Sequence, residues 1–174
     1  EQVKKWLKTN GSQIVIGVVI GLSAFWGWGF YGDYQDQQSQ SARALYLTYA
    51  SDSNSVETYD QLLTDYGSSS YADQASLLMA KKLFDAGNYQ SVLSIIEPLT
   101  SSDNGAISST AILRTATVYL QLGQHESALT MLDSLTDANF LGLVHSMKGD
   151  IYLDLANMPE AQKHYQLAIN SITD

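Results

Sequence analysis

Three kinds of residue are scarce in this 174-residue chain, and each scarcity excludes a class of structure or site. Cysteine is absent, which excludes disulfides and thiolate metal sites. Proline occurs only twice, so no proline-rich linker divides the chain. Basic residues are few: residues 33–174 hold 6 basic and 17 acidic side chains, a formal net charge of −11. Such a domain repels phosphate, so we expect no nucleic-acid partner.

Charge is absent from Thr9 to Gly32, a run of 24 residues. As a helix this run is about 36 Å long, enough to cross a hydrocarbon layer of ~30 Å. Its apolar side chains, including Val15, Val19 and Leu22, point in every direction, whereas a core helix in a protein of this size keeps one wet face. We therefore predict a transmembrane helix in contact with the lipid bilayer at residues 13–32, rather than a buried core helix.

The residues on either side of this run predict its orientation. Lysines precede it and aspartates follow it, so residues 1–12 should be a short cytoplasmic segment and residues 33–174 should be exported. A cleaved signal peptide also begins with basic residues, but its apolar region is shorter and ends at a small-x-small site. Here the run ends instead in bulky aromatic residues, although small residues flank Leu22 and leave cleavage open. The aromatic residues are Trp26, Trp28, Phe30, Tyr31 and Tyr34.

Three later stretches repeat one pattern at a period of 33 to 36 residues. Each has a small residue, a large residue three positions later, a turn, and then a second stretch with helical apolar periodicity. The intervals are the same in all three stretches. The corresponding positions are Ala80, Leu83, Gly87, Val92, Ile96 and Leu99, then Ala116, Tyr119, Gly123, Ala128, Leu132 and Leu135, then Gly149, Tyr152, Ala156, Ala161, Tyr165 and Ala168.

Helix packing explains this spacing. A small residue on the first helix lets the second helix approach, and a small residue on the second, such as Ala128 or Ala161, receives the large side chain opposite. Gly87 and Gly123 stand where a helix end takes the left-handed conformation. Short turns then return the chain antiparallel, so that helix hairpins stack. The pattern resembles the tetratricopeptide repeat, although the signature tryptophan and the closing proline of that family are missing.

We therefore predict an all-α chain, in which a single transmembrane helix precedes an α-solenoid of tetratricopeptide-like helix hairpins. The repeat units are expected at residues 71–100, 108–137 and 142–172. Residues 33–70 carry two further apolar stripes separated by an SDSNS turn. These two atypical helices are expected to cap the stack.

The sequence has no residue pattern that would support catalysis or bind a cofactor. No glycine-rich phosphate loop and no Gly-x-Ser-x-Gly turn occurs. His145 occupies a position where the repeats keep a bulky core residue, so packing explains it better than metal binding. Asp150 and Asp154 share a helix face, which solvation explains better than an acid pair or a calcium site. We predict no catalytic residue, cofactor or metal, and a role in binding other proteins.

Two surfaces are candidates for such binding. The first helices of stacked hairpins line a concave face that suits segments of other polypeptides, and there Tyr71 and Tyr89 are the candidate contacts. Tyr119 and Tyr152 are instead expected to pack in the repeats. Small residues four positions apart in the apolar run favour close approach of another membrane helix. These residues are Gly17, Gly21, Ser23 and Gly27.

Four segments carry a resemblance that extends over the chain: KKWLKTNG, GVVIGLSAFWGWGFY, QSARALYLTY and KGDIYLDLANMPEAQKHYQLAI. With these segments the chain resembles the ancillary SecYEG translocon subunits of Gram-negative bacteria, the YfgM type. The resemblance implies a single-pass protein of the bacterial inner membrane, with its N-terminus in the cytoplasm and its repeats in the periplasm. The implied partners are the SecYEG channel and the membrane-anchored periplasmic chaperone PpiD. The implied role is to help newly exported, unfolded polypeptides pass from the channel to periplasmic chaperones.

Two other classes of function stay open at this point. A cell-envelope assembly factor would share both the repeats and the anchor. A regulator that holds a signalling partner at its cytoplasmic end would need a longer segment than residues 1–12.

Overall fold

The computed structural model of this protein describes residues 2–52 and 55–173, and of residues 2–10, 12–15, 24, 27–29 and 172–173 it describes the backbone alone. Over the described residues the chain is helical and has no strand. It divides into two compact units, Glu1–Ala44 and Leu45–Asp174. The helices are α1 (Gln2–Ser51), α2 (Val56–Tyr66), α3 (Ser70–Asp85), α4 (Tyr89–Ile96), α5 (Gly105–Gln121), α6 (His125–Asp133), α7 (Leu141–Asp154) and α8 (Met158–Thr173), with the short 3-10 helices η1 (Pro98–Ser101) and η2 (Ala138–Phe140).

The first unit consists of the N-terminal part of α1. Large apolar side chains on it are exposed to solvent, among them Phe25 at 78%, Trp26 at 77% and Phe30 at 79%. Within the described residues, no helix combines the length and the apolar character that a membrane crossing requires. The transmembrane helix predicted at residues 13–32 is therefore not confirmed, and part of that range lies outside the residues whose side chains are described.

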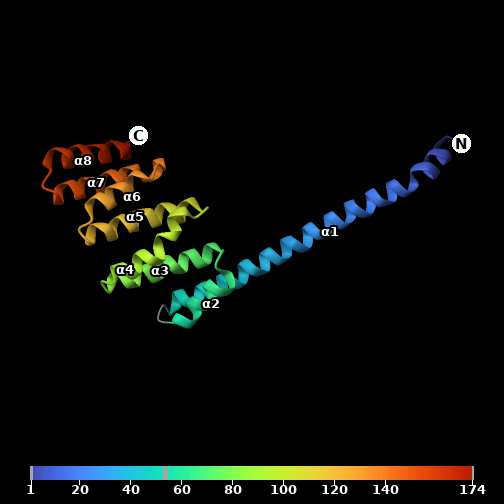
Figure 1. Ribbon diagram of the computed structural model, residues 1–174, viewed down its shortest axis with the longest axis horizontal. Helices are drawn as coiled ribbons and strands as arrows, with labels where there is room; N and C mark the ends of the chain where they lie inside the picture. Colours follow the sequence, from blue (N-terminus) through green and yellow to red (C-terminus); the bar gives the residue numbers. More distant parts are fainter. Residues whose placement is uncertain (1, 53–54, 174) are drawn as a thin grey trace. The chain divides into compact units, whose positions relative to one another are not determined.

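The second unit is a stack of three helix hairpins, in which α3 pairs with α4, α5 with α6, and α7 with α8 (Figure 1). Each hairpin also contacts the next, because α4 packs against α5 and α6 packs against α7. The helix α2 packs against α3 at the start of the stack, where Tyr49 and Tyr59 are buried with their ring centroids 5.4 Å apart. The prediction of an all-α solenoid of helix hairpins is confirmed.

The first helix of every hairpin ends in the same hydrogen-bonded turn. At the end of α3, the Gly87 N–H donates to the Phe84 carbonyl over 2.9 Å, and the Asn88 N–H donates to the Leu83 carbonyl over 2.9 Å. These two bonds satisfy carbonyls that have no partner within the helix, and they require a left-handed residue at the turn. That residue has φ +74° at Gly87, +70° at Gly123 and +56° at Ala156.

Small residues let the two helices of a hairpin approach each other. Ala80 and Ala116 on the first helices are buried, and so are Ala128 and Ala161 on the second helices. Gly149 is the clearest case, because a Cβ atom placed there would lie 2.5 Å from Cε1 of the Tyr165 ring.

The hairpins are held together by two clusters of buried apolar side chains. The first joins α3, α4 and α5, and the second joins α5, α6 and α7. Ile96 belongs to the first cluster and Leu132 to the second, and both are completely buried. Removing such a side chain from water stabilises the fold by about 1.5–3 kcal/mol. The resulting stack holds α3 and α5 at fixed positions beside each other.

Candidate protein-binding site

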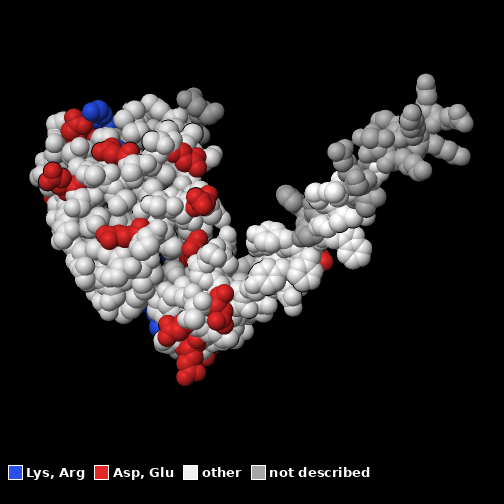
Figure 2. Space-filling view, turned by 45° about the vertical axis from the view of Figure 1, so that its right-hand side comes forward, with Lys and Arg blue, Asp and Glu red and all other residues white. Residues whose placement is uncertain are grey.

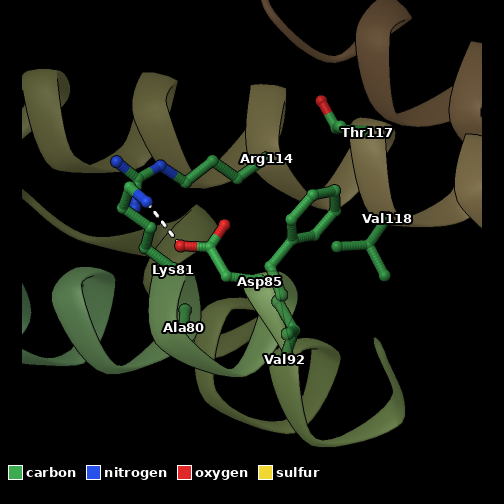
Figure 3. Close-up of a pocket in the computed structure, with 8 residues that line it drawn as sticks. Ala80, Lys81, Asp85, Val92, Arg114, Thr117 and Val118 are labelled. Atoms are coloured by element: carbon green, nitrogen blue, oxygen red, sulfur yellow. Dashed lines mark hydrogen bonds and ion pairs between the residues drawn. The ribbon is translucent and has the colours of Figure 1, made fainter. Parts of the chain in front are cut away.

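A groove of about 250 Å³ lies between the first helices of the first two hairpins, α3 and α5, with α4 behind it (Figure 3). Its volume is below the ~300–1,000 Å³ that is usual for pockets that enclose small ligands. The groove therefore suits one or two side chains of a longer segment better than a whole cofactor. It is lined by Ala80, Lys81, Phe84, Asp85, Val92, Arg114, Thr117 and Val118.

Local sequence signals position the two helices that form this groove. The Ala72 N–H donates to Ser69 Oγ over 3.2 Å at the start of α3. At the start of α5, Asn104 Oδ1 accepts from the N–H groups of Ala106 and Ile107. Such side-chain caps satisfy N–H groups that lack a helical partner and define where each helix begins. The groove residues then follow on successive turns of α3 and α5.

The floor of the groove is apolar. Val118 of α5 and Val92 of α4 are almost fully buried there. Phe84 stands beside Tyr89, with the two ring centroids 5.2 Å apart. Val92 occupies the position where the next two hairpins have alanine. The floor can accept an apolar side chain from another molecule, because the Phe84 ring beside the two valines is only partly buried.

The rim of the groove is charged. Lys81 Nζ pairs with Asp85 Oδ2 at 2.6 Å, and both side chains are exposed. Arg114 reaches across from α5 and donates from Nη1 to the Leu77 carbonyl over 2.6 Å. In Figure 3 the Arg114 guanidinium extends toward Lys81, on the same side of the groove. Among the charged side chains visible in Figure 2, acidic ones predominate.

The two tyrosines predicted as partner contacts lie outside this groove. Tyr71 is half-buried, with its ring centroid 5.9 Å from that of Tyr46. Tyr89 is half-buried against Phe84. Sequence reasoning did not single out Phe84 or Arg114, which both line the groove. For Arg114 a signal was available, because it is a single arginine on the first helix of a hairpin in an acidic domain.

The other predicted residues are distributed over the two units. A Cβ atom at Gly17 or Gly21 would meet nothing within 4 Å, and Ser23 is exposed, whereas the surroundings of Gly27 lie outside the described residues. Tyr119, expected in the core, is only half-buried, and its hydroxyl donates to Glu97 Oε1 over 2.7 Å. That hydrogen bond raises the pKa of Tyr119, and burial raises it further.

Two histidines of the third hairpin lie together, which sequence reasoning did not foresee. His145 of α7 and His164 of α8 have their Nδ1 atoms 3.1 Å apart, and the Tyr152 ring stacks on His164 with centroids 5.3 Å apart. Burial lowers the pKa of both histidines, and the nearby charge of Lys148 lowers both further. In the described part of the chain, no three His, Cys, Asp or Glu residues converge as metal ligands.

Stacked antiparallel helix hairpins with a groove along their first helices define a helical-repeat protein. The chain belongs to the tetratricopeptide repeat-like domain family, which it matches over residues 4–174. It is 26% identical over 179 aligned residues to a protein of Haemophilus influenzae named ancillary SecYEG translocon subunit, with 98% of this chain and 86% of that protein covered. A protein of Escherichia coli with the same name is 23% identical, with 98% and 85% covered. The family resemblance drawn from the sequence is confirmed.

Solved structures of lower sequence identity share the fold. A structure described as the MamA RS-1 ArsTM double mutant has a TM-score of 0.57 at 15% identity, and the alignment covers 79% of this chain and 75% of that one. A structure described as MamA MSR-1 C2 has a TM-score of 0.54 at 13% identity, with 74% and 71% covered. These likenesses support the helical-repeat architecture alone.

Proposed function

We propose that this protein is a membrane-anchored, non-enzymatic scaffold that associates with the SecYEG protein-export channel and holds segments of newly exported polypeptides in the α3–α5 groove. Two observations carry the proposal: the chain has an apolar groove on its first helices, and it matches relatives named as translocon subunits over 86% and 85% of their length. Tetratricopeptide-like stacks bind partner segments on such a face.

The anchor is part of this proposal. Residues 13–32 are free of charged side chains, and the large apolar groups described in that range are exposed to solvent. An exposed apolar surface of this kind needs a lipid or protein environment. We place the N-terminus in the cytoplasm and the repeats in the periplasm, because the lysines precede the run.

The role after channel exit follows from the same arrangement. A scaffold tethered beside the channel holds an emerging segment at high local concentration and releases it to another binder. We propose that the periplasmic chaperone PpiD is one such binder. A groove that holds only one or two side chains favours short-lived contacts, as a transfer step needs.

Photocrosslinking in the cell tests the groove. A photoreactive residue at Phe84 should crosslink to a translocating polypeptide and should lose that crosslink once translocation is complete. The matched control places the same residue at Gln162, an exposed position on α8. Equal crosslinking at the two positions, or none at Phe84, would contradict a client site in the groove.

A separate experiment tests the anchor. The change Gly17→Leu with Gly21→Leu should reduce copurification with the channel after mild solubilisation while the protein stays in the membrane fraction, because bulky side chains prevent close helix approach. The control changes Ile16 and Ile20 to leucine on the same helix. Unchanged copurification in the glycine variant would move the channel contact to the repeats.

A further inference from the structure

We propose that the α3–α5 groove prefers segments in which a large apolar side chain is followed closely by an acidic side chain. This inference rests on the proposed function and names the class of segment that the groove selects. The preference for a large apolar side chain follows from the floor, where Phe84, Val92 and Val118 face the groove. An apolar side chain placed there removes further surface of the half-buried Phe84 ring from water, which favours binding at about 25 cal/mol per Å².

The preference for an acidic side chain follows from the hydrogen-bond partner of Arg114. The basic residues Lys81, Lys148 and Lys163 each pair with a carboxylate of this chain. Arg114 instead donates to a neutral carbonyl, that of Leu77. A hydrogen bond to a carbonyl orients the guanidinium but leaves its charge uncompensated. A guanidinium has five N–H donors and binds carboxylates through two of them, so a carboxylate from outside the chain fits here.

The charge of the whole domain makes this position selective. Residues 33–174 carry a net charge of −11, so the domain as a whole repels an acidic segment. Within the groove, Lys81 and Arg114 outweigh the single carboxylate of Asp85. Since Arg114 is partly buried beside the apolar floor, solvent screens its charge less than it screens the exposed lysines.

Fluorescence anisotropy with labelled peptides tests the preference. Two peptides with amidated C-termini share a Leu-Phe pair and differ only in Asp or Asn two positions later. With the full chain in detergent micelles, the Asp peptide should bind about fivefold more tightly, as expected for a partly exposed charge-assisted hydrogen bond. The preference should disappear in Arg114→Gln and persist in Lys163→Gln, which removes a cation on α8.

The outcomes separate this inference from the proposed function. If Phe84→Ser weakens both peptides but the wild type binds Asp and Asn peptides equally, the groove binds segments and the acidic preference is wrong. If neither peptide binds, or if Phe84→Ser changes neither affinity, the groove is not the client site and both proposals fail. If Arg114→Gln lowers the melting temperature, the salt dependence of the wild-type preference is the second measurement. The preference for the Asp peptide must decrease as the salt concentration rises toward ~0.5 M, and a constant preference overturns the inference.

Discussion

The first two hairpins and the third hairpin reach the same backbone geometry with different residues. Where Gly87 and Gly123 occupy the left-handed position after the first helix, the third hairpin has Ala156 with φ +56°. Where the first two hairpins have alanine at the helix contact, the third has Gly149 beneath the Tyr165 ring. The hydrogen bonds of the turn are nevertheless the same in all three. The repeat therefore conserves a backbone conformation and a close helix approach, not a set of residues.

This exchange has an energetic consequence for the third hairpin. Glycine inside a helix costs about 0.5–1 kcal/mol relative to alanine, and a left-handed alanine costs roughly 1–2 kcal/mol. The third hairpin thus carries two local penalties that the others avoid. We expect the packing of the long second helix α8 against α7, with the Tyr165 hydroxyl donating to Asp150 Oδ1 over 2.7 Å, to offset them.

The largest expected effect breaks the helix contact that all three hairpins share. Ala128 is completely buried on α6, so Ala128→Glu places a carboxylate among apolar side chains. We expect a loss of ~3 kcal/mol or more in the free energy of unfolding, measured by urea denaturation. Thr130→Glu, on the exposed side of the same helix, should change it by less than ~0.5 kcal/mol. Equal effects of the two variants would show that α6 does not bury this face.

A smaller effect is confined to the third hairpin. Gly149→Ala adds a Cβ atom 2.5 Å from the Tyr165 ring, so either the ring or the helices must move. We expect a loss of about 1–3 kcal/mol, typical of overpacking, despite the better helix propensity of alanine. The double variant with Tyr165→Leu should recover part of that loss, and simple additivity of the two changes would disprove the contact.

The turn residues should respond with opposite signs. Gly123→Ala should destabilise the domain by about 1 kcal/mol and Ala156→Gly should stabilise it by a similar amount, because only the left-handed conformation is being tested. A Cβ atom at Gly123 meets nothing within 4 Å, so no clash contributes. Thermal unfolding of both variants gives the comparison, and a loss of stability in Ala156→Gly would contradict the conformational explanation.

Spacing along the chain was enough to predict the hairpins, because helix geometry relates small and large residues at constant intervals. For this reason the same interval separates the left-handed turn residue from the buried alanine in two hairpins, from Gly123 to Ala128 and from Ala156 to Ala161. Residue type alone did not reveal that Ala156 is left-handed, since alanine is ordinarily a helix former. The groove was not predicted, because Arg114 meets Leu77 across 37 positions of sequence, a relation that depends on how hairpins stack.

The same limit applies to the tyrosines and the anchor. Tyr71 and Tyr89 were predicted as partner contacts from residue type, whereas their surroundings depend on Tyr46 and Phe84 from other positions in the fold. The transmembrane helix at residues 13–32 stays a prediction from composition.

The last difference between the hairpins concerns pH, since the paired histidines occur only in the third. The pKa values of His145 and His164 both lie below the ordinary 6.5, and burial is the largest cause for both. The charge of His145 lowers the pKa of His164 further, and nearby lysine charges lower the pKa of both histidines. The lysines are Lys148, which affects both histidines, and Lys163, which affects His164; Glu160 opposes them at His164. The unfolded chain therefore binds more protons than the folded chain once the pH falls toward and below 6.5, and stability decreases as the pH falls.

Urea midpoints measured between about pH 7.5 and pH 5.5 report this loss, above the range in which most carboxylates titrate. We expect the loss to be smaller than the effect of the turn variants, because neither histidine is fully buried. The double variant His145→Gln with His164→Gln should remove the dependence over this range, whereas His125→Gln, which removes the 2.5 Å pair with Asp154, should leave it in place. If the double variant keeps the full pH dependence, the contact between α7 and α8 is not its source, and the third hairpin differs from the first two in geometry alone.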